Sequence, residues 1–149
     1  MGTAMSYVES HGLVSESEYP YKARKGTCSI PRGASTVSIS SHSRVTKDSP
    51  SAMKSAVAKG PVSIAIEADK AAFQSYKSGV LSSSKCGTNL DHGVLIVGYG
   101  TDSKYGKYWK VKNSWGKTWG ESGYVRLARS DSNGKGECGC LMEGYLPKY

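Results

Sequence analysis

The sequence predicts an α+β fold dominated by antiparallel β-strands, with one sheet curled into a barrel-like shape and two or three short helices. Three observations support this prediction. The 149 residues include 18 glycines and 10 tyrosines but a single phenylalanine, which favours turns and aromatic strand residues over a helical bundle. Short apolar patterns that alternate like strands recur along the chain. Polar, glycine-containing turns separate them, as is typical of antiparallel sheets.

The chain opens with a predicted short helix over residues 3–11. Gly12 follows as a plausible C-cap, and the next twenty residues are turn-rich and polar, which indicates a loop. A half-buried strand is predicted over residues 37–45, with Val37 and Ile39 on its inner face. The apolar side chains at helical spacing in the opening helix are Ala4, Met5 and Val8.

A second helix of about ten residues is predicted after this strand. Ser49 fits the N-cap, Pro50 the first helical position and Gly60 a left-handed C-cap. A third, short helix is predicted over residues 71–77. Strand patterns occupy residues 62–66, 94–97, 108–111 and 124–127. The core residues predicted from the last two strands are Trp109, Val111, Val125 and Leu127.

Charge and hydropathy narrow the classes of function. The net charge is +8, from 20 Lys and Arg against 12 Asp and Glu, but the basic residues are scattered singly along the chain. Nucleic-acid binding would therefore rest on the net charge alone. Basic residues solvated at the surface are the better interpretation. No stretch is long and apolar enough for a membrane span, and the N-terminus lacks the pattern of a signal peptide. We therefore expect no nucleic acid and no membrane among the partners.

Four cysteines carry no paired C-x-x-C spacing, so we expect no zinc or other metal site and no cofactor. Disulfides are one use of such widely separated cysteines and would indicate an oxidising compartment, while free buried thiols are the alternative. The four are Cys28, Cys86, Cys138 and Cys140.

Two of the predicted strands, joined by a polar turn at residues 100–106, form a natural hairpin. If paired residues sum to 205, His92 lies opposite Asn113, with Cβ atoms about 4.5–5.5 Å apart. The asparagine oxygen could then hold one imidazole nitrogen, which would orient the ring as a general base. A bulge would shift this register by one residue and turn one side chain away. A purely structural histidine is the alternative.

Three strings, LDHGVLIVGYG, YWKVKNSWGKTWGESGYVRLAR and ECGCLMEGYLP, resemble the C-terminal half of papain and the cathepsins. The start of the chain resembles the helix and YPY turn of the same family, so essentially all residues align in order. The resemblance implies the β-rich right domain of the papain fold, with the left helical domain largely missing. Residues 1–12 would be a helix bordering the missing half, and residues 13–149 the β-rich domain.

The resemblance also assigns roles. It implies that His92 is the catalytic base, that Asn113 orients it, and that Trp115 shields the pair from water. The family's nucleophilic cysteine would lie roughly 40 residues before Met1, and the glutamine that helps to stabilise the oxyanion is also absent from this sequence. We therefore expect the chain alone to be inactive.

Further assignments follow from the same resemblance. Cys86 and Cys138 match a family disulfide, Cys28 matches a cysteine whose partner lies in the missing half, and Cys140 has no recognised counterpart. Glu143 matches the floor of the pocket that receives the second substrate residue on the acyl side of the cut bond, and there it would favour Arg alongside Leu or Phe. A surface carboxylate is the alternative. The other predicted substrate-binding residues are Met1, Ala65, Leu90, Asp91, Gly93 and Trp115.

Three hypotheses for the function remain open. The chain is part of a cysteine-type endopeptidase, one chain of a two-chain enzyme, or a non-catalytic papain-like structural or binding module. The first two imply a peptide or protein substrate once the missing half completes the site. The second and the third imply a partner chain against the first helix. By family, the location would be lysosomal, vacuolar or secreted.

Overall fold

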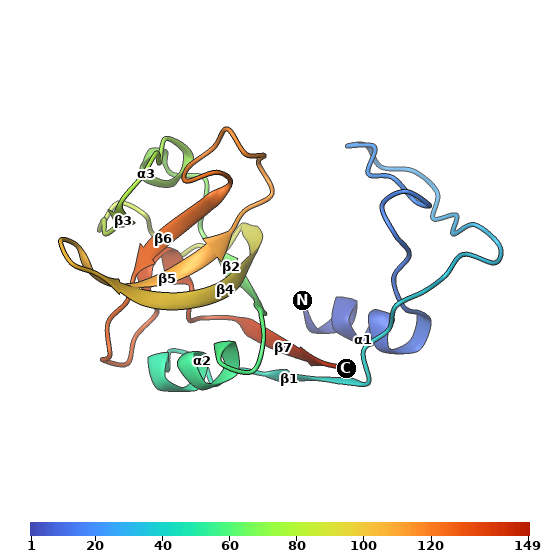
Figure 1. The fold of residues 1–149 in the computed structure, drawn as a ribbon, viewed down its shortest axis with the longest axis horizontal. Helices are drawn as coiled ribbons and strands as arrows, with labels where there is room; N and C mark the ends of the chain where they lie inside the picture. Colours follow the sequence, from blue (N-terminus) through green and yellow to red (C-terminus); the bar gives the residue numbers. More distant parts are fainter. The chain divides into compact units, whose positions relative to one another are not determined.

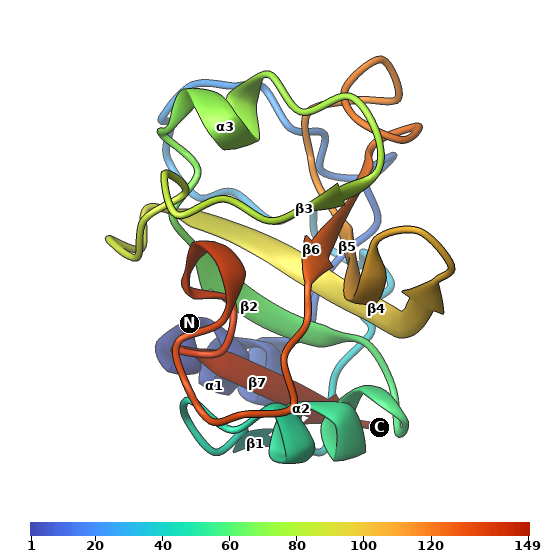
Figure 2. The same ribbon diagram turned by 90° about the vertical axis from the view of Figure 1, so that its left-hand side faces the viewer.

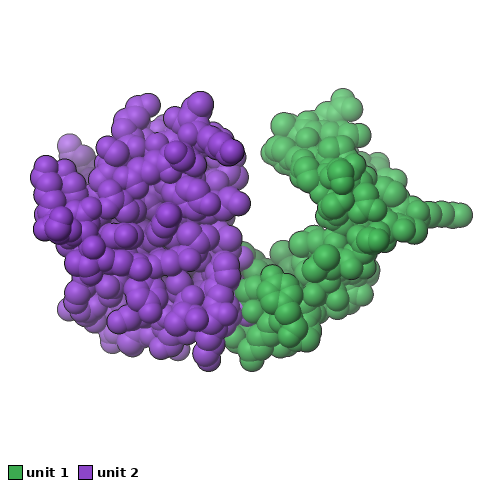
Figure 3. Space-filling model, viewed as in Figure 1, with its two compact units in different colours: residues 1–43, 147–149 green, residues 44–146 purple.

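The computed structural model describes all residues from 1 to 149. The chain divides into two compact units, which Figure 3 shows in different colours. The first comprises residues 1–43 with 147–149, and the second comprises residues 44–146. The loop after the first helix groups with that helix, and the predicted boundary at residue 13 stays a prediction. No helix in the structure combines the length and the apolar composition that crossing a membrane requires.

The strands form one seven-stranded sheet in the order β1-β7-β2-β4-β5-β6-β3. Its pairs are antiparallel between β2 and β4, β2 and β7, β4 and β5, and β5 and β6, whereas β3 runs parallel to β6. The order has two ends, so the sheet is barrel-like without being closed. The strands are β1 (Ser41–Arg44), β2 (Val62–Ile66), β3 (Val80–Leu81), β4 (His92–Asp102), β5 (Gly106–Lys112), β6 (Tyr124–Ala128) and β7 (Gly144–Lys148). The mostly antiparallel α+β fold is confirmed.

Three short α-helices and one 3-10 turn accompany the sheet. They are α1 (Gly2–His11), α2 (Pro50–Val57), α3 (Ala71–Gln74) and η1 (Glu137–Gly139). Within the second unit, α2 and α3 lie toward opposite ends of the sheet, and β4 and β5 form a long curved hairpin between them (Figure 1 and Figure 2). The three predicted helices are thus present, although α3 is shorter than expected.

The caps predicted for α2 are confirmed only in part. Ser49 is the N-cap, and its hydroxyl accepts a hydrogen bond from the backbone N–H of Ala52. The predicted left-handed cap at Gly60 is wrong, because the helix already ends at Val57 and Gly60 is not among the residues with positive φ. Pro61 follows Gly60, and the residue before a proline is driven toward extended backbone.

The strand predicted over residues 37–45 begins later, at Ser41. Val37 is 67% exposed and makes only an isolated bridge to Leu13, so its predicted place on a half-buried face is wrong. Ile39 is buried as expected. Pairing with β7 explains the late start, since the backbone bonds to that strand run from Ser40 to Val45.

The core of the second unit lies between the inner face of the sheet and the short helices. All four core residues predicted from the last two strand patterns are fully buried. Because strand side chains alternate, the same pattern in β2 buries every second residue. The largest buried side chains of the core are Trp109, Phe73, Met53, Ile64, Ile66, Ile96 and Leu127.

Candidate active site

The two residues predicted to act together come from neighbouring strands. His92 is the first residue of β4, where it pairs with Ile66 of β2. Asn113 directly follows β5 and is 8% exposed. Its backbone N–H donates to the carbonyl of Gly123, which holds the end of β5 against the segment that leads into β6.

The side chains of His92 and Asn113 are joined by a hydrogen bond of 2.8 Å between Nε2 and Oδ1. The backbone N–H of Ser114 donates to the same Oδ1 at 2.8 Å. A backbone N–H can only donate, so this second bond identifies the asparagine atom as the oxygen. The imidazole therefore carries its proton on Nε2, and in the neutral ring Nδ1 keeps a lone pair that can accept a proton.

The observed register of the hairpin differs from the predicted one. Near the turn, paired residues sum to 208, as for Asp102 with Gly106. Beyond an irregularity midway along β4 they sum to 207, as for Leu95 with Lys112. The turn is therefore centred further along the chain than the value of 205 assumed.

This difference moves the predicted pair from opposite to diagonal positions. If the numbers of paired residues continue to sum to 207, Asn113 lies opposite Val94, which is two residues from His92. A two-residue offset keeps both side chains on one face of the sheet, whereas an offset of one residue would separate them. Diagonal neighbours stand about 7–8 Å apart, within reach of long side chains. The contact is therefore made although the directly opposed register was wrong.

An aromatic cluster lies on one side of the imidazole. The ring of Trp115 lies 5.1 Å from that of His92, centroid to centroid. Phe73 and Trp119 lie 5.5 Å and 5.3 Å from Trp115, each nearly perpendicular to it. Phe73 is fully buried in α3, so the core anchors this group. Sequence patterns gave no sign of Phe73 and Trp119, because only the folded chain brings α3 to the loop after β5.

Three of the predicted pocket residues are brought together by the backbone of β2. Ala65 pairs with Gly93 of β4 on one side. On the other side, its N–H donates to the carbonyl of Glu143 at 3.2 Å. All three residues are thus fixed by main-chain contacts at one end of the sheet. Met1 belongs to the first unit, and its role in the pocket stays a prediction.

Leu90 and Met142 both lie over Gly139. A Cβ atom at Gly139 would stand 2.9 Å from Leu90 Cδ2 and 3.1 Å from Met142 Sδ, and its φ is +76°. Glycine is therefore required at this position for two reasons, space and backbone conformation. Met142, next to Glu143, was not among the predicted site residues. No periodicity distinguishes it in sequence, since it lies on an irregular turn before β7.

Asp91 contacts the backbone. Its Oδ1 accepts a hydrogen bond of 2.7 Å from the N–H of Ala68, and its own N–H donates to the carbonyl of Ile66 at 2.9 Å. These bonds hold the residue just before His92 against the end of β2. A contact between Asp91 and substrate stays a prediction.

The cysteines are of three kinds. Cys86 and Cys138 form the predicted disulfide. Cys140 is a fully buried free thiol whose pKa is raised to about 12, first by burial and then by the nearby Glu137 carboxyl. Cys28 is an exposed free thiol in the first unit. The sulfur atoms of Cys86 and Cys138 lie within 4.8 Å of a carboxylate oxygen of Glu137, but the disulfide removes both as metal ligands.

An imidazole oriented by an asparagine is the kind of arrangement that can serve as a general base in nucleophilic catalysis. Residues 1–148 match the family described as papain family cysteine protease. The chain belongs to this family, as its sequence motifs indicated.

Curated relatives and solved structures agree with this assignment. Vignain of Ricinus communis is 47% identical over 99% of this chain, and oryzain beta chain of Oryza sativa subsp. japonica is 49% identical over 94% of it. The chain spans 41% and 30% of their lengths, respectively. The bromelain protease of Ananas comosus, solved with the inhibitor E64, is 44% identical with a TM-score of 0.87; the match covers 99% of this chain and 68% of that one.

Proposed function

We propose that this chain provides the catalytic base and its orienting amide in a cysteine-type endopeptidase. The observation that carries the proposal is the hydrogen bond from His92 Nε2 to Asn113 Oδ1, which leaves Nδ1 as the proton acceptor. In the proposed reaction Nδ1 takes the proton of a cysteine thiol, and the thiolate attacks the peptide carbonyl. The imidazolium then protonates the leaving amine, and water releases the acyl group from sulfur.

The nucleophile and the glutamine of the oxyanion site are proposed to come from residues outside these 149. Within the chain, the disulfide occupies two cysteines, and the raised pKa of the buried Cys140 thiol opposes formation of a thiolate. The exposed Cys28 matches a disulfide cysteine of the family rather than its nucleophile. We therefore propose that the 149-residue chain alone does not hydrolyse peptides.

Complementation tests this proposal. The chain is assayed with a fluorogenic peptide alone, and again after fusion to the N-terminal part of bromelain that it does not match. We expect hydrolysis only from the fusion, and its loss in the His92→Ala variant of the fusion. Hydrolysis by the chain alone that survives combined Cys28→Ser and Cys140→Ser changes would contradict the proposal. So would an inactive fusion when the same bromelain segment activates bromelain's own C-terminal part.

The substrate pocket is proposed to include Ala65, Leu90 and Gly93, with Glu143 as its floor. Support comes from the backbone contacts that hold Ala65 between Gly93 and Glu143. A carboxylate at the end of an otherwise apolar pocket would bind a basic side chain and still admit Leu or Phe. Peptide or protein substrates with Arg, Leu or Phe at the second acyl-side position are therefore proposed.

A docking role for α1 is the second proposal. None of its residues is buried, and the apolar side chains Ala4, Met5 and Val8 stay exposed or half-exposed. Such a helix gains stability when a partner covers its apolar side. A partner chain or the other half of a peptidase would fit this surface. By family, a lysosomal, vacuolar or secreted location is proposed.

A further inference from the structure

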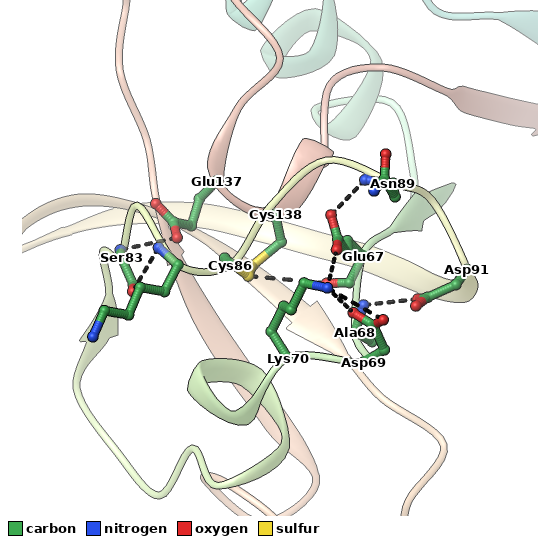
Figure 4. Close-up of a disulfide and its surroundings, with 11 residues drawn as sticks. Glu67, Ala68, Asp69, Lys70, Ser83, Cys86, Asn89, Asp91, Glu137 and Cys138 are labelled. Carbon is green, nitrogen blue, oxygen red and sulfur yellow. Dashed lines mark hydrogen bonds and ion pairs between the residues drawn. A yellow bond between two sulfur atoms is a disulfide. The ribbon is translucent and has the colours of Figure 1, made fainter.

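The segment from Cys86 to His92 connects the disulfide to the proposed base, and one buried carboxylate holds its middle. Glu67 directly follows β2 and is only 1% exposed. Its Oε2 accepts a hydrogen bond from the backbone N–H of Asn89. Its Oε1 lies 3.0 Å from the ammonium of Lys70. Figure 4 shows Glu67 between these two partners, beside the disulfide.

The carboxylate also fills the space above Gly87. A Cβ atom at Gly87 would stand 2.6 Å from Glu67 Cδ, and the φ of Gly87 is +77°. No side chain fits there unless the carboxylate moves. Glu67 therefore contacts the segment at two positions, by a hydrogen bond at Asn89 and by close packing at Gly87.

The residues on either side of Glu67 hold the same segment through the backbone. Ile66 accepts a hydrogen bond from the N–H of Asp91, and Ala68 donates to the side chain of Asp91. Ile66 is also the β-sheet partner of His92. The three consecutive residues 66–68 thus hold Asn89 and Asp91 by hydrogen bonds. The strand pairing of Ile66 with His92 then positions the backbone that carries the imidazole.

Burial of a carboxylate costs free energy unless the charge is paired and hydrogen-bonded. Glu67 meets both conditions, and its pKa is lowered first by the N–H of Asn89 and then by Lys70. The group stays ionised at neutral pH, when its bond to the backbone N–H is a strong, charge-assisted one. An apolar side chain at this position would leave the Asn89 N–H unpaired.

We propose that Glu67 is a positioning residue for the site: its carboxylate fixes residues 87–91 so that Leu90 and His92 are held in their places. This inference rests on the proposed function only in calling His92 the base. The hydrogen bond from His92 to Asn113 depends on where the backbone puts His92, so displacement of the segment reaches the imidazole. A role limited to stability would leave that hydrogen bond unchanged in the folded variant.

Nuclear magnetic resonance of the 149-residue chain tests the inference without any need for peptidase activity. Two signals are followed: the hydrogen exchange of the Asn89 amide and the Nε2–H resonance of His92. In Glu67→Ala we expect the Asn89 amide to exchange at least about tenfold faster, with the His92 resonance shifted or broadened. Glu67→Gln keeps an acceptor for Asn89 and should restore both signals.

Met53→Ala is the matched control, because it removes a fully buried side chain from α2 and lowers global stability without touching the carboxylate. Both signals should stay as in the unchanged chain. If Glu67→Ala does not fold, Gly87→Ala tests the same contact from the opposite side and should give the same two changes.

Unchanged Asn89 exchange and an unchanged His92 resonance in a folded Glu67→Ala or Gly87→Ala chain would overturn the inference. Equal changes in Met53→Ala, or failure of Glu67→Gln to restore the signals, would do so as well. Failure of the proposed function appears elsewhere, in a bromelain fusion whose hydrolysis does not require His92. The two results are therefore independent.

Discussion

The indole of Trp115 lies against the imidazole of His92, with ring centroids 5.1 Å apart and ring planes inclined by 31°. Trp115 is 39% exposed. The perpendicular rings of Phe73 and Trp119 fix the indole, and Trp119 Nε1 donates to the carbonyl of Gln74 at 3.0 Å. We expect the indole to act as an apolar cover for the partly buried hydrogen bond between His92 and Asn113.

Replacement of this cover should expose the bond between His92 and Asn113. In Trp115→Ala we expect the Nε2 proton of His92 to exchange with water about tenfold faster, because local opening controls such exchange. Nuclear magnetic resonance of the chain measures it. Trp115→Phe keeps an aromatic cover and should show a smaller effect. Equal exchange in all three proteins would show that the indole does not shield the pair.

The disulfide should be a large contributor to stability. Cys86 and Cys138 are 52 residues apart in sequence, and closing a loop of that length in the unfolded chain is worth about 4 kcal/mol by the chain-entropy estimate. We expect the double change to serine to lower the free energy of unfolding by about 2–4 kcal/mol. Urea unfolding at equilibrium measures this.

The free thiols provide the control for that experiment. Cys28→Ser removes an exposed thiol and should leave the unfolding free energy unchanged. The native chain should react with a thiol reagent once at pH 8, at Cys28, because the pKa of the buried Cys140 thiol is about 12. The unfolded chain should react twice. Three or more reactive thiols would show that the disulfide is absent.

The ion pairs of Arg126 should make the free energy of unfolding depend on pH in the acidic range. Its guanidinium binds Glu121 through Nε and Nη2, at 2.9 Å and 2.8 Å, and Asp102 through Nη1 at 2.6 Å. These contacts lower the pKa of both carboxyls below their ordinary values of 4.5 and 3.8. A lowered folded-state pKa adds stability that is present above the unfolded-state pKa and is lost as pH falls through the folded value.

We therefore expect the free energy of unfolding to fall as pH drops below about 4.5, and to fall less steeply in Arg126→Met. Urea unfolding between pH 3 and 7 measures both slopes. Arg44→Met, which changes an exposed arginine of β1, is the control and should keep the original slope. Parallel slopes for Arg126→Met and the unchanged chain would rule out this source of acid sensitivity.

The preference of the proposed pocket depends on Glu143. In the active fusion, Glu143→Gln should lower kcat/KM for a substrate with Arg at the second acyl-side position by about fivefold, with little change for Leu, because a partly exposed ion pair is worth about 1 kcal/mol. Asp69→Asn alters an exposed acid on the loop after β2 and should leave the preference unchanged. A Glu143→Gln fusion with the original Arg to Leu ratio would exclude Glu143 from the pocket.

Local sequence signals predicted those features that depend on neighbouring residues. The N-cap at Ser49 and the alternating burial of β2 and β6 follow from side-chain chemistry and strand period. The disulfide came from the family resemblance alone, since spacing left free thiols open. The register of the hairpin was missed mainly because its turn is centred further along the chain than assumed, and in addition an irregularity midway along β4 changes the pairing by one residue.

By itself, the sequence determined the family and the mostly antiparallel sheet, because strand period and motif letters are local properties that do not depend on distant contacts. It also predicted that His92 meets Asn113, but not the diagonal register in which they do so. Only the tertiary structure decided which surroundings those two residues receive. The buried Glu67 beneath the segment that leads to His92, and Phe73 behind Trp115, come from parts of the chain that no periodicity links to the hairpin. Packing brings such partners together because a buried carboxylate needs hydrogen-bond donors, and because an aromatic ring in the core must be in close contact with its neighbours.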